Sequence, residues 1–279
     1  MILRQILKLF QSAAGKPPYN LVELLLPSEH LKRDVQVDVY RPASINPELQ
    51  LFIFFDGQDV RTMRVGQLQR QLLKEGYPPI MVVGIHANER RMQEYGTISQ
   101  PDYAKRGRKA GATAKFVIQE LLPYLTQQYD LDLKPHNCHI AGFSLGGLMA
   151  FDLAWHYPQH FGTAGIFSGS LWWRSTPFDE AEPDANRIVH TQVAEATELP
   201  PIRYWFQAGT EDETSDRNGN GVIDAIDDTV QLIALLKERG QVEEDVCYLE
   251  VEGGRHEPGT WAGVLGDFLR WSVKGGSRK

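Results

Sequence analysis

The strongest constraint on this chain is a serine set between two glycines, where a short apolar run gives way to a helix-forming one. Residues 138–141 are typical of a buried strand, and residues 148–155 of a helix. Between them Gly142, Ser144 and Gly146 form the G-x-S-x-G pattern of a nucleophile elbow. A serine on so sharp a turn is strained, so its flanking positions must lack clashing side chains. The pattern predicts a hydroxyl lifted clear of a sheet and facing a helix start; the alternative is an ordinary glycine-rich turn.

Composition indicates an ordinary soluble globule. The chain has 279 residues, of which 42% are hydrophobic and 23% charged, and its net charge is −7. An acidic balance argues against nucleic acid or an anionic membrane as the main partner. Cys138 and Cys247 are both interpreted as buried thiols, which suits a reducing compartment. Residues 1–18 are expected to form a helix or tail without a signal peptide, so a cytoplasmic location is expected; self-association stays open.

Strands alternate with helices from residue 51 onward, which predicts a single doubly wound α/β domain over residues 19–279. Residues 34–41 alternate between apolar and polar side chains and should form a half-buried antiparallel strand. A helix is expected over 110–129, bent at Pro123. The polar segment 86–107 is expected to be a long functional loop. The expected strands are 19–26, 34–41, 51–55, 80–85, 138–141, 163–167, 202–208 and 245–251.

A serine nucleophile needs a base and a carboxylate that orients the base. In this architecture they follow the serine in the order acid, then histidine, at strand ends. His256 comes soon after the strand 245–251. The strand 202–208 is followed by three consecutive carboxylates, Glu211 to Glu213. Asp212 is the preferred acid and Glu211 the second choice, while the others would be solvated loop residues.

The oxyanion of a tetrahedral intermediate needs two hydrogen-bond donors. The backbone N–H of Leu145, which follows the serine, is the expected first donor. The second should come from the loop after the strand 51–55, where the N–H of Gln58 is the candidate. The alternative for this loop is an ordinary Asp-Gly turn.

Residues 216–227 match an EF-hand-like calcium loop, with oxygen side chains at loop positions 1, 3, 5, 9 and 12 and Gly221 at position 6. Aspartate rather than glutamate fills position 12, as in dockerin-type loops. The alternative is a Gly/Asn/Asp turn that caps the next helix. The hypothesis is a structural Ca²⁺ that stiffens the loop carrying the acid; no cofactor is expected for catalysis. The candidate ligands are Asp216, Asn218, Asn220, Val222, Asp224 and Asp227.

Three further residues are candidates for a substrate pocket. Glu94 lies in the long polar loop, and Trp172 and Trp173 lie in an irregular segment after the strand 163–167. They could shape an acyl or alcohol pocket. The alternative is a packed lid with solvated charges.

Together these segments resemble the putative esterase family of α/β hydrolases, which includes esterase D, enterochelin-type siderophore esterases, feruloyl esterases and mycolyltransferases. The resemblance runs from about Tyr19 to the end of the chain and implies an α/β-hydrolase fold, with a mostly parallel sheet of about eight strands and helices on both faces. Leu145 stands where formylglutathione hydrolases usually carry methionine, so the chain looks closer to the enterochelin-esterase-like branch. The calcium-like loop departs from the commonest members. The resembling segments are 55–59, 88–96, 120–123, 142–147, 168–173 and 252–257.

These expectations combine into a serine hydrolase that acts on small-molecule carboxylic esters, possible siderophore esters included. Ser144 would attack the acyl carbon, with His256 as base and then acid. Asp212 would orient the imidazole, and water would hydrolyse the acyl-enzyme. An acyltransferase with the same triad is one alternative. A catalytically silent binding protein on the same fold is another.

Overall fold

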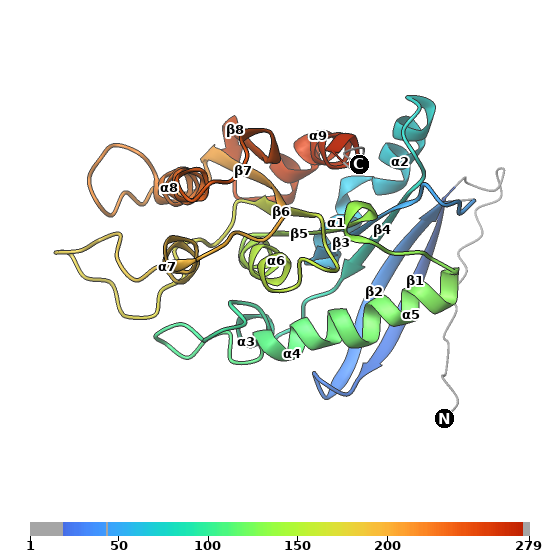
Figure 1. The fold of residues 1–279 in the computed structure, drawn as a ribbon, viewed down its shortest axis with the longest axis horizontal. Helices are drawn as coiled ribbons and strands as arrows, with labels where there is room; N and C mark the ends of the chain where they lie inside the picture. The colour runs from blue at the N-terminus through green and yellow to red at the C-terminus, as the bar shows by residue number, and fades with distance from the viewer. Residues whose placement is uncertain (1–18, 43, 276–279) are drawn as a thin grey trace.

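The computed structural model describes residues 19–42 and 44–275, so the predicted helix or tail at 1–18 lies outside the described residues. Its centre is one eight-stranded sheet in the order β1-β2-β4-β3-β5-β6-β7-β8 (Figure 1). The number of strands agrees with the eight expected runs. The strands are β1 (Tyr19–Ser28), β2 (Arg33–Pro42), β3 (Gln50–Phe55), β4 (Ile80–Ile85), β5 (Cys138–Phe143), β6 (Thr163–Phe167), β7 (Arg203–Glu211) and β8 (Val246–Arg255).

Helices and short helical turns connect these strands. Among the described residues, none of the helices is both long and apolar enough to cross a membrane. The α-helices are α1 (Gly57–Val60), α2 (Val65–Lys74), α3 (Arg91–Glu94), α4 (Ala110–Lys115), α5 (Leu122–Tyr129), α6 (Leu145–His156), α7 (Ile188–Glu195), α8 (Asp224–Glu238) and α9 (Pro258–Gly275). The other helical turns are η1 (Arg61–Met63), η2 (Phe116–Leu121), η3 (Pro135–Asn137) and η4 (Glu243–Asp245).

The sheet is antiparallel at one side and parallel through the rest. β1 pairs with β2, and β2 with β4, in antiparallel fashion, which confirms the pairing expected for residues 34–41. The strand β2 is buried on both faces at its centre, where Asp38 and Tyr40 are covered as well. The strands β4, β3, β5, β6, β7 and β8 are parallel neighbours. Because parallel strands end at the same edge, the residues after β3, β5, β7 and β8 are carried to one rim of the sheet.

Both faces of the sheet are covered, as the all-apolar central strands require. Leu51, Ile53 and Phe55 of β3 belong to one buried core, and Phe52 and Phe54 belong to another on the opposite face. This division follows from the two-residue period of a strand. The first core includes apolar residues of α5, α6, α7 and α8, and the second those of α2 and α9. Figure 1 shows these two helix layers on either side of the sheet.

The boundaries of several elements differ from expectation. β7 continues to Glu211 and β8 to Arg255, so the expected acid and base follow their strands immediately. The helical stretch after β3 is interrupted between η1 and α2 at Arg64, whose φ of 51° is left-handed. The helix over 110–129 changes to π-helical hydrogen bonding in η2, just before Pro123 enters the first turn of α5, where a missing N–H is tolerated.

Candidate active site

The elbow at Ser144 has the strained geometry that its glycines predict. Ser144 has φ 56° and ψ −121° and is followed at once by α6. A Cβ atom on Gly142 would lie 2.3 Å from the Gly146 carbonyl oxygen, and one on Gly146 would lie 2.5 Å from Asp56 Oδ2. Larger residues would therefore force the turn apart. The Ser144 N–H donates to the Phe167 carbonyl at 2.8 Å, which ties the elbow to the end of β6.

Both expected oxyanion donors lie in the first turns of helices at this rim. Leu145 is the first residue of α6, and Gln58 is the second residue of α1. Backbone N–H groups in a first helical turn lack an acceptor within the helix. The Gln58 side chain is fixed at both ends, because its Nε2 donates to Asp56 Oδ1 at 3.2 Å and its Oε1 accepts the Ala87 N–H at 3.0 Å.

His256 directly follows β8 and lies beside the elbow through a shared tryptophan. Its ring packs edge-on against Trp261, with centroids 5.4 Å apart, and Trp261 stacks at 4.8 Å on Phe143, the residue before Ser144. Trp261 is itself anchored, since its Nε1 donates to Ser168 Oγ at 2.9 Å. His256 is exposed overall, yet burial of its ring lowers its pKa. The negative charge of Asp212 raises the pKa of His256, and the positive charge of Arg91 lowers it further.

Of the three consecutive carboxylates, the structure separates Asp212 from its neighbours. Glu211 pairs with Arg255 at 3.0 Å on the exposed surface. Asp212 is buried, with 9% of its surface exposed, and its Oδ2 accepts the Gly209 N–H at 3.0 Å. Its Oδ1 is buried and has no hydrogen-bond partner among the described residues. A buried carboxylate oxygen in this state needs a donor, and the nearby imidazole of His256 is a suitable one.

Two groups at this rim were not given a catalytic role from the sequence, although Arg91 lies in the polar loop 86–107 that was expected to be functional. Ser170 Oγ lies 3.4 Å from Ser144 Oγ, and the Ser170 N–H donates to the Ser144 carbonyl at 3.1 Å. Arg91 forms a two-point ion pair with Asp56, with both N–O distances 2.7 Å. Both residues stand in the segments that carry the family resemblance, which is the signal that the sequence offered for both.

The three residues expected in a substrate pocket are placed differently from one another. Glu94 is 1% exposed and pairs with Arg33, with Nη2 2.5 Å from Oε2. Trp173 is fully buried. Neither therefore faces open space in this structure. Trp172 is 36% exposed and lines a cavity of about 780 Å³ between the segments that follow β6 and β7.

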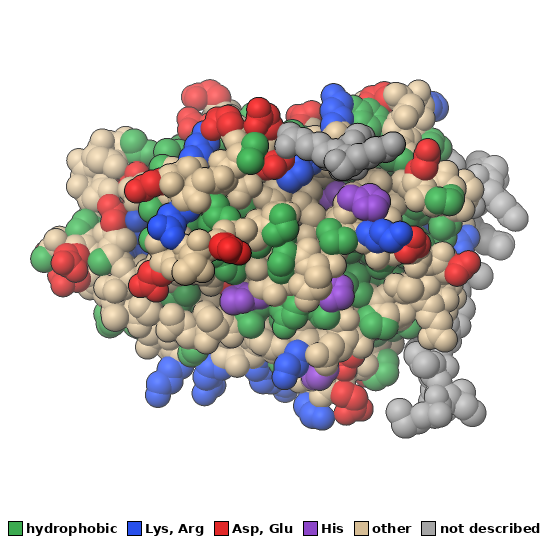
Figure 2. Space-filling model, viewed as in Figure 1, with side chains coloured by type: hydrophobic (Ala, Val, Ile, Leu, Met, Phe, Trp, Pro, Cys, Tyr) green, Lys and Arg blue, Asp and Glu red, His purple; other side chains and the backbone are tan. Residues whose placement is uncertain are grey.

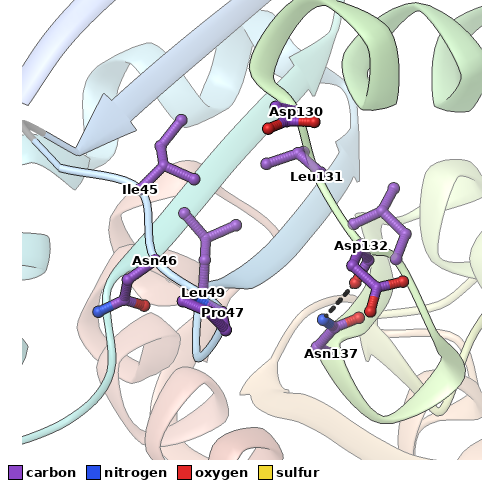
Figure 3. Close-up of a pocket in the computed structure, with 9 residues that line it drawn as sticks. Ile45, Asn46, Pro47, Leu49, Asp130, Leu131, Asp132 and Asn137 are labelled. Atoms are coloured by element: carbon purple, nitrogen blue, oxygen red, sulfur yellow. Dashed lines mark hydrogen bonds between the residues drawn. The ribbon is translucent and has the colours of Figure 1, made fainter.

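This cavity lies at the loop end of the molecule, where acidic side chains are prominent in Figure 2. Besides Trp172, its lining includes Phe178, Glu180 and Glu213. A second cavity, of about 350 Å³, lies at the opposite rim of the sheet (Figure 3). Its lining residues Leu49 and Asn137 immediately precede β3 and β5, so it lies away from the elbow.

Several oxygens of the loop 216–227 accept hydrogen bonds from within the loop. The described residues contain no group of three or more His, Cys, Asp or Glu side chains that could hold a metal ion. Asp216 accepts the N–H groups of Asn220 and Gly221, at 3.1 and 2.9 Å. Asp227 Oδ2 accepts the Asn218 side-chain amide at 2.8 Å.

A guanidinium already supplies positive charge inside this loop. Arg217 pairs with Asp224 at 3.2 Å, with Asp184 at 2.7 Å and with Asp228. Burial alone would lower the pKa of Arg217, but Asp228 and the other carboxylates raise it. Asp224 and Asp227 are thus both engaged in contacts within the protein. Calcium binding stays a prediction.

Comparison with known proteins places the chain among esterases. Iron(III) enterobactin esterase of Escherichia coli (strain K12) is 23% identical over 254 residues, which cover 89% of this chain and 56% of the relative. The uncharacterized protein YbbA of Bacillus subtilis (strain 168) is 22% identical over 251 residues, or 88% of this chain and 94% of the relative.

Solved structures show the same fold. The crystal structure of the enterobactin esterase FES from Shigella flexneri, in the presence of 2,3-di-hydroxy-N-benzoyl-glycine, superposes with a TM-score of 0.69 at 22% identity. The match covers 94% of this chain and 60% of that one, so this chain spans well under two thirds of the enterobactin esterase. The likeness confirms the predicted α/β-hydrolase fold.

The sequence profile of the putative esterase family matches residues 28–271, nearly the whole of the described chain. This match includes the elbow, the Asp56 loop, Asp212 and His256. Carboxylic ester hydrolysis is the activity that such a match indicates. The chain belongs to the putative esterase family.

Proposed function

We propose that this protein hydrolyses small carboxylic esters through an acyl-enzyme on Ser144. The observation that carries the proposal is the backbone of Ser144, a non-glycine residue held at φ 56° and ψ −121° at the start of α6. Strain of this kind persists only where the surrounding structure enforces it, and it gathers at reactive sites. Here Gly142 and Gly146 permit the close approach that this turn requires, because a Cβ atom at either position would lie within 2.5 Å of a neighbouring atom.

In the proposed mechanism, the imidazole of His256 takes the proton from the Ser144 hydroxyl as the oxygen attacks the acyl carbon. The lowered pKa of His256 supports this role, because burial keeps the imidazole neutral near pH 7. Asp212 would accept the other ring N–H through its unpartnered Oδ1 and stabilise the imidazolium as it forms. The same imidazolium then protonates the leaving alcohol, and water repeats the sequence to release the acid.

Negative charge on the acyl oxygen would be held by the backbone N–H groups of Leu145 and Gln58. Both lie in the first turn of a helix, and helix starts favour negative charge. Such donors contribute mainly in the transition state, where the charge develops. No metal is needed in any of these steps.

The relatives named for iron(III) enterobactin support a siderophore ester as one candidate substrate. An acyltransferase would use the same residues and differ only in which hydroxyl compound attacks the acyl-enzyme. Partitioning of the acyl group between water and added alcohols distinguishes a hydrolase from an acyltransferase. If more than half of the product is free acid at a moderate alcohol concentration, the protein is a hydrolase.

The test is steady-state hydrolysis of 4-nitrophenyl esters of graded acyl length, with enterobactin as a further substrate. We expect Ser144→Ala and His256→Gln each to lower kcat by about 10³-fold or more. Asp212→Asn should also lower kcat strongly, but less than these two variants. Ser44→Ala removes the hydroxyl of an exposed residue that precedes β3, and it serves as the matched control. Ester hydrolysis that survives Ser144→Ala would contradict the proposal.

A further inference from the structure

Arg91, the first residue of α3, joins two segments of the active site that are far apart in the sequence. Its Nε and Nη2 each lie 2.7 Å from an oxygen of Asp56. The same Nη2 also donates to the Phe143 carbonyl at 3.3 Å. One planar group therefore binds the residue before α1 and the residue before Ser144.

Asp56 and Phe143, the two residues that Arg91 contacts, each lie two positions before a proposed oxyanion donor. Gln58 comes two residues after Asp56, and Leu145 comes two residues after Phe143. The spacing between the two donor N–H groups thus depends on how Asp56 and Phe143 are held relative to each other. Arg91 contacts both directly.

The Asp56 carboxylate is fitted tightly into this arrangement. It is 1% exposed, and its backbone has a left-handed φ of 60°. Its Oδ2 is so close to Gly146 that a Cβ there would lie 2.5 Å away, so the carboxylate packs directly on the elbow. Its Oδ1 also accepts the Gln58 side chain at 3.2 Å. A buried carboxylate of this kind requires a cation, and Arg91 provides it.

The Arg91 side chain is held from the other side as well. Its guanidinium lies 5.4 Å from the centre of the Tyr95 ring, and Tyr95 is almost fully buried against Phe55. The planar fork of arginine makes two parallel bonds to one carboxylate while a further N–H reaches a third acceptor. Lysine has one nitrogen and cannot reproduce these three contacts in fixed directions.

We propose that Arg91 is a positioning residue for the oxyanion hole, holding the Gln58 and Leu145 N–H groups at the separation that a tetrahedral intermediate requires. The inference rests on the proposed function of this site. Arg91 acts through Asp56 and Phe143 rather than by touching the substrate.

The test measures kcat and KM separately for Arg91→Lys and Arg91→Gln, with each rate expressed per active site titrated by a fluorophosphonate. Misplaced donors weaken binding of the transition state and leave ground-state binding unchanged. We expect kcat to fall by about 10- to 100-fold in both variants while KM changes by less than about twofold. Binding of an alkyl boronic acid, which forms a tetrahedral adduct on the serine, should weaken by a similar factor.

Arg33→Lys is the matched control. Arg33 also forms a two-point pair with a buried carboxylate, Glu94, through Nε at 3.0 Å and Nη2 at 2.5 Å, but it contacts neither donor segment. We expect its kcat per titrated site to stay within about twofold of the wild type.

The outcomes distinguish failure of the proposed esterase function from failure of the positioning role of Arg91. If the wild-type protein hydrolyses no ester, the proposed function fails. If it does hydrolyse esters, and Arg91→Lys keeps its kcat and its boronic acid affinity, the positioning role is wrong. Equal losses in Arg91→Lys and Arg33→Lys, or a loss confined to the fraction of titratable sites, would also overturn it, because they indicate support of the fold alone.

Discussion

At the scale of single residues, the site depends on side chains whose surroundings leave them few alternatives. Ser144 is strained, Asp56 is neutralised by Arg91, and Asp212 retains a buried oxygen for which the described part of the chain offers no hydrogen-bond partner. His256 is held against Trp261, which also stacks on Phe143. Trp261 connects His256 with the residue before Ser144, and Arg91 connects Asp56 with that same residue.

The pH dependence of the reaction follows from the environment of His256. Burial of the ring lowers its pKa below 6.5, Asp212 partly opposes this, and Arg91 adds to it. The base works when neutral, so kcat/KM should be at its plateau at pH 7 and fall as the pH drops through a midpoint below 6.5. The measurement is kcat/KM for a 4-nitrophenyl ester between pH 4.5 and 8. A midpoint above 7 would contradict this account of the base.

Asp212→Asn tests the direction in which Asp212 shifts the pKa of His256. Removal of the negative charge takes away the one interaction among these that raises the pKa of His256. The remaining activity of this variant should therefore have an acid midpoint lower than that of the wild type. The same midpoint in both proteins would mean that the carboxylate does not act on the imidazole.

Some of these residues could be predicted from the sequence and others could not. Ser144 carries a local signature, because its strain requires glycines at fixed spacing, and His256 follows from its place after the last strand. Arg91 and Asp56 are 35 residues apart and have no such pattern. Glu94 and Trp173 were expected near substrate, but tertiary packing buries them, and burial cannot be inferred from residue type in a polar segment.

At the scale of elements, the parallel strands determined most of what the sequence could predict. All-apolar runs such as β3 and β4 are easily identified as central strands, and their order brings the reactive loops to one rim. Loop detail was less predictable. The spacing of residues 216–227 resembles a calcium loop, yet spacing does not reveal that Arg217 turns inward and pairs with Asp184 and Asp228.

Chelation tests whether the Arg217 guanidinium or a bound calcium ion stabilises the loop 216–227. Since Arg217 already pairs with its carboxylates, we expect the thermal midpoint in EDTA to match that in millimolar calcium to within about 1 °C. The measurement is differential scanning calorimetry in both buffers, with bound calcium quantified after dialysis. A clear fall of the midpoint on chelation, with one calcium per chain, would instead confirm the calcium prediction.

Arg217→Gln tests the same loop from the protein side. It leaves the buried Asp228 with Arg187 alone, and we expect a loss of roughly 1–3 kcal/mol in the free energy of unfolding. Lys237→Gln breaks an exposed pair with Glu243 and is the control, with an expected loss of less than about 1 kcal/mol. Equal stability of both variants would show that Arg217 does not support the loop.

At the scale of the whole molecule, two histidines are enclosed by the packed layers. Burial lowers the pKa of His139 and of His190 to about 3 in each case. His139 stacks on Phe52 at 4.3 Å and is 3.0 Å from Gln50, while His190 bonds the Asp228 carbonyl at 2.8 Å. Both stay neutral in the fold where the unfolded chain would become protonated.

This difference predicts sensitivity to mild acid. A histidine with a lowered pKa in the folded state contributes stability that is lost as the pH falls below 6.5, by about 1.4 kcal/mol per pH unit for each residue. Unfolding by urea at pH 7 and pH 5 measures the loss. His139→Gln should be less stable than the wild type at pH 7 but lose about 2 kcal/mol less on acidification. His30→Gln, in the turn between β1 and β2, should retain the wild-type dependence; identical pH dependence in all three proteins would contradict the prediction.

The central claim is that folding makes one serine of this chain reactive. The most direct measurement is intact-mass and peptide-mass analysis of the protein after reaction with a fluorophosphonate. The account predicts one adduct per chain, located on Ser144 and lost in Ser144→Ala, with labelling greatly slowed in His256→Gln. A protein that hydrolyses esters but carries the adduct on another residue, or carries none, would contradict it.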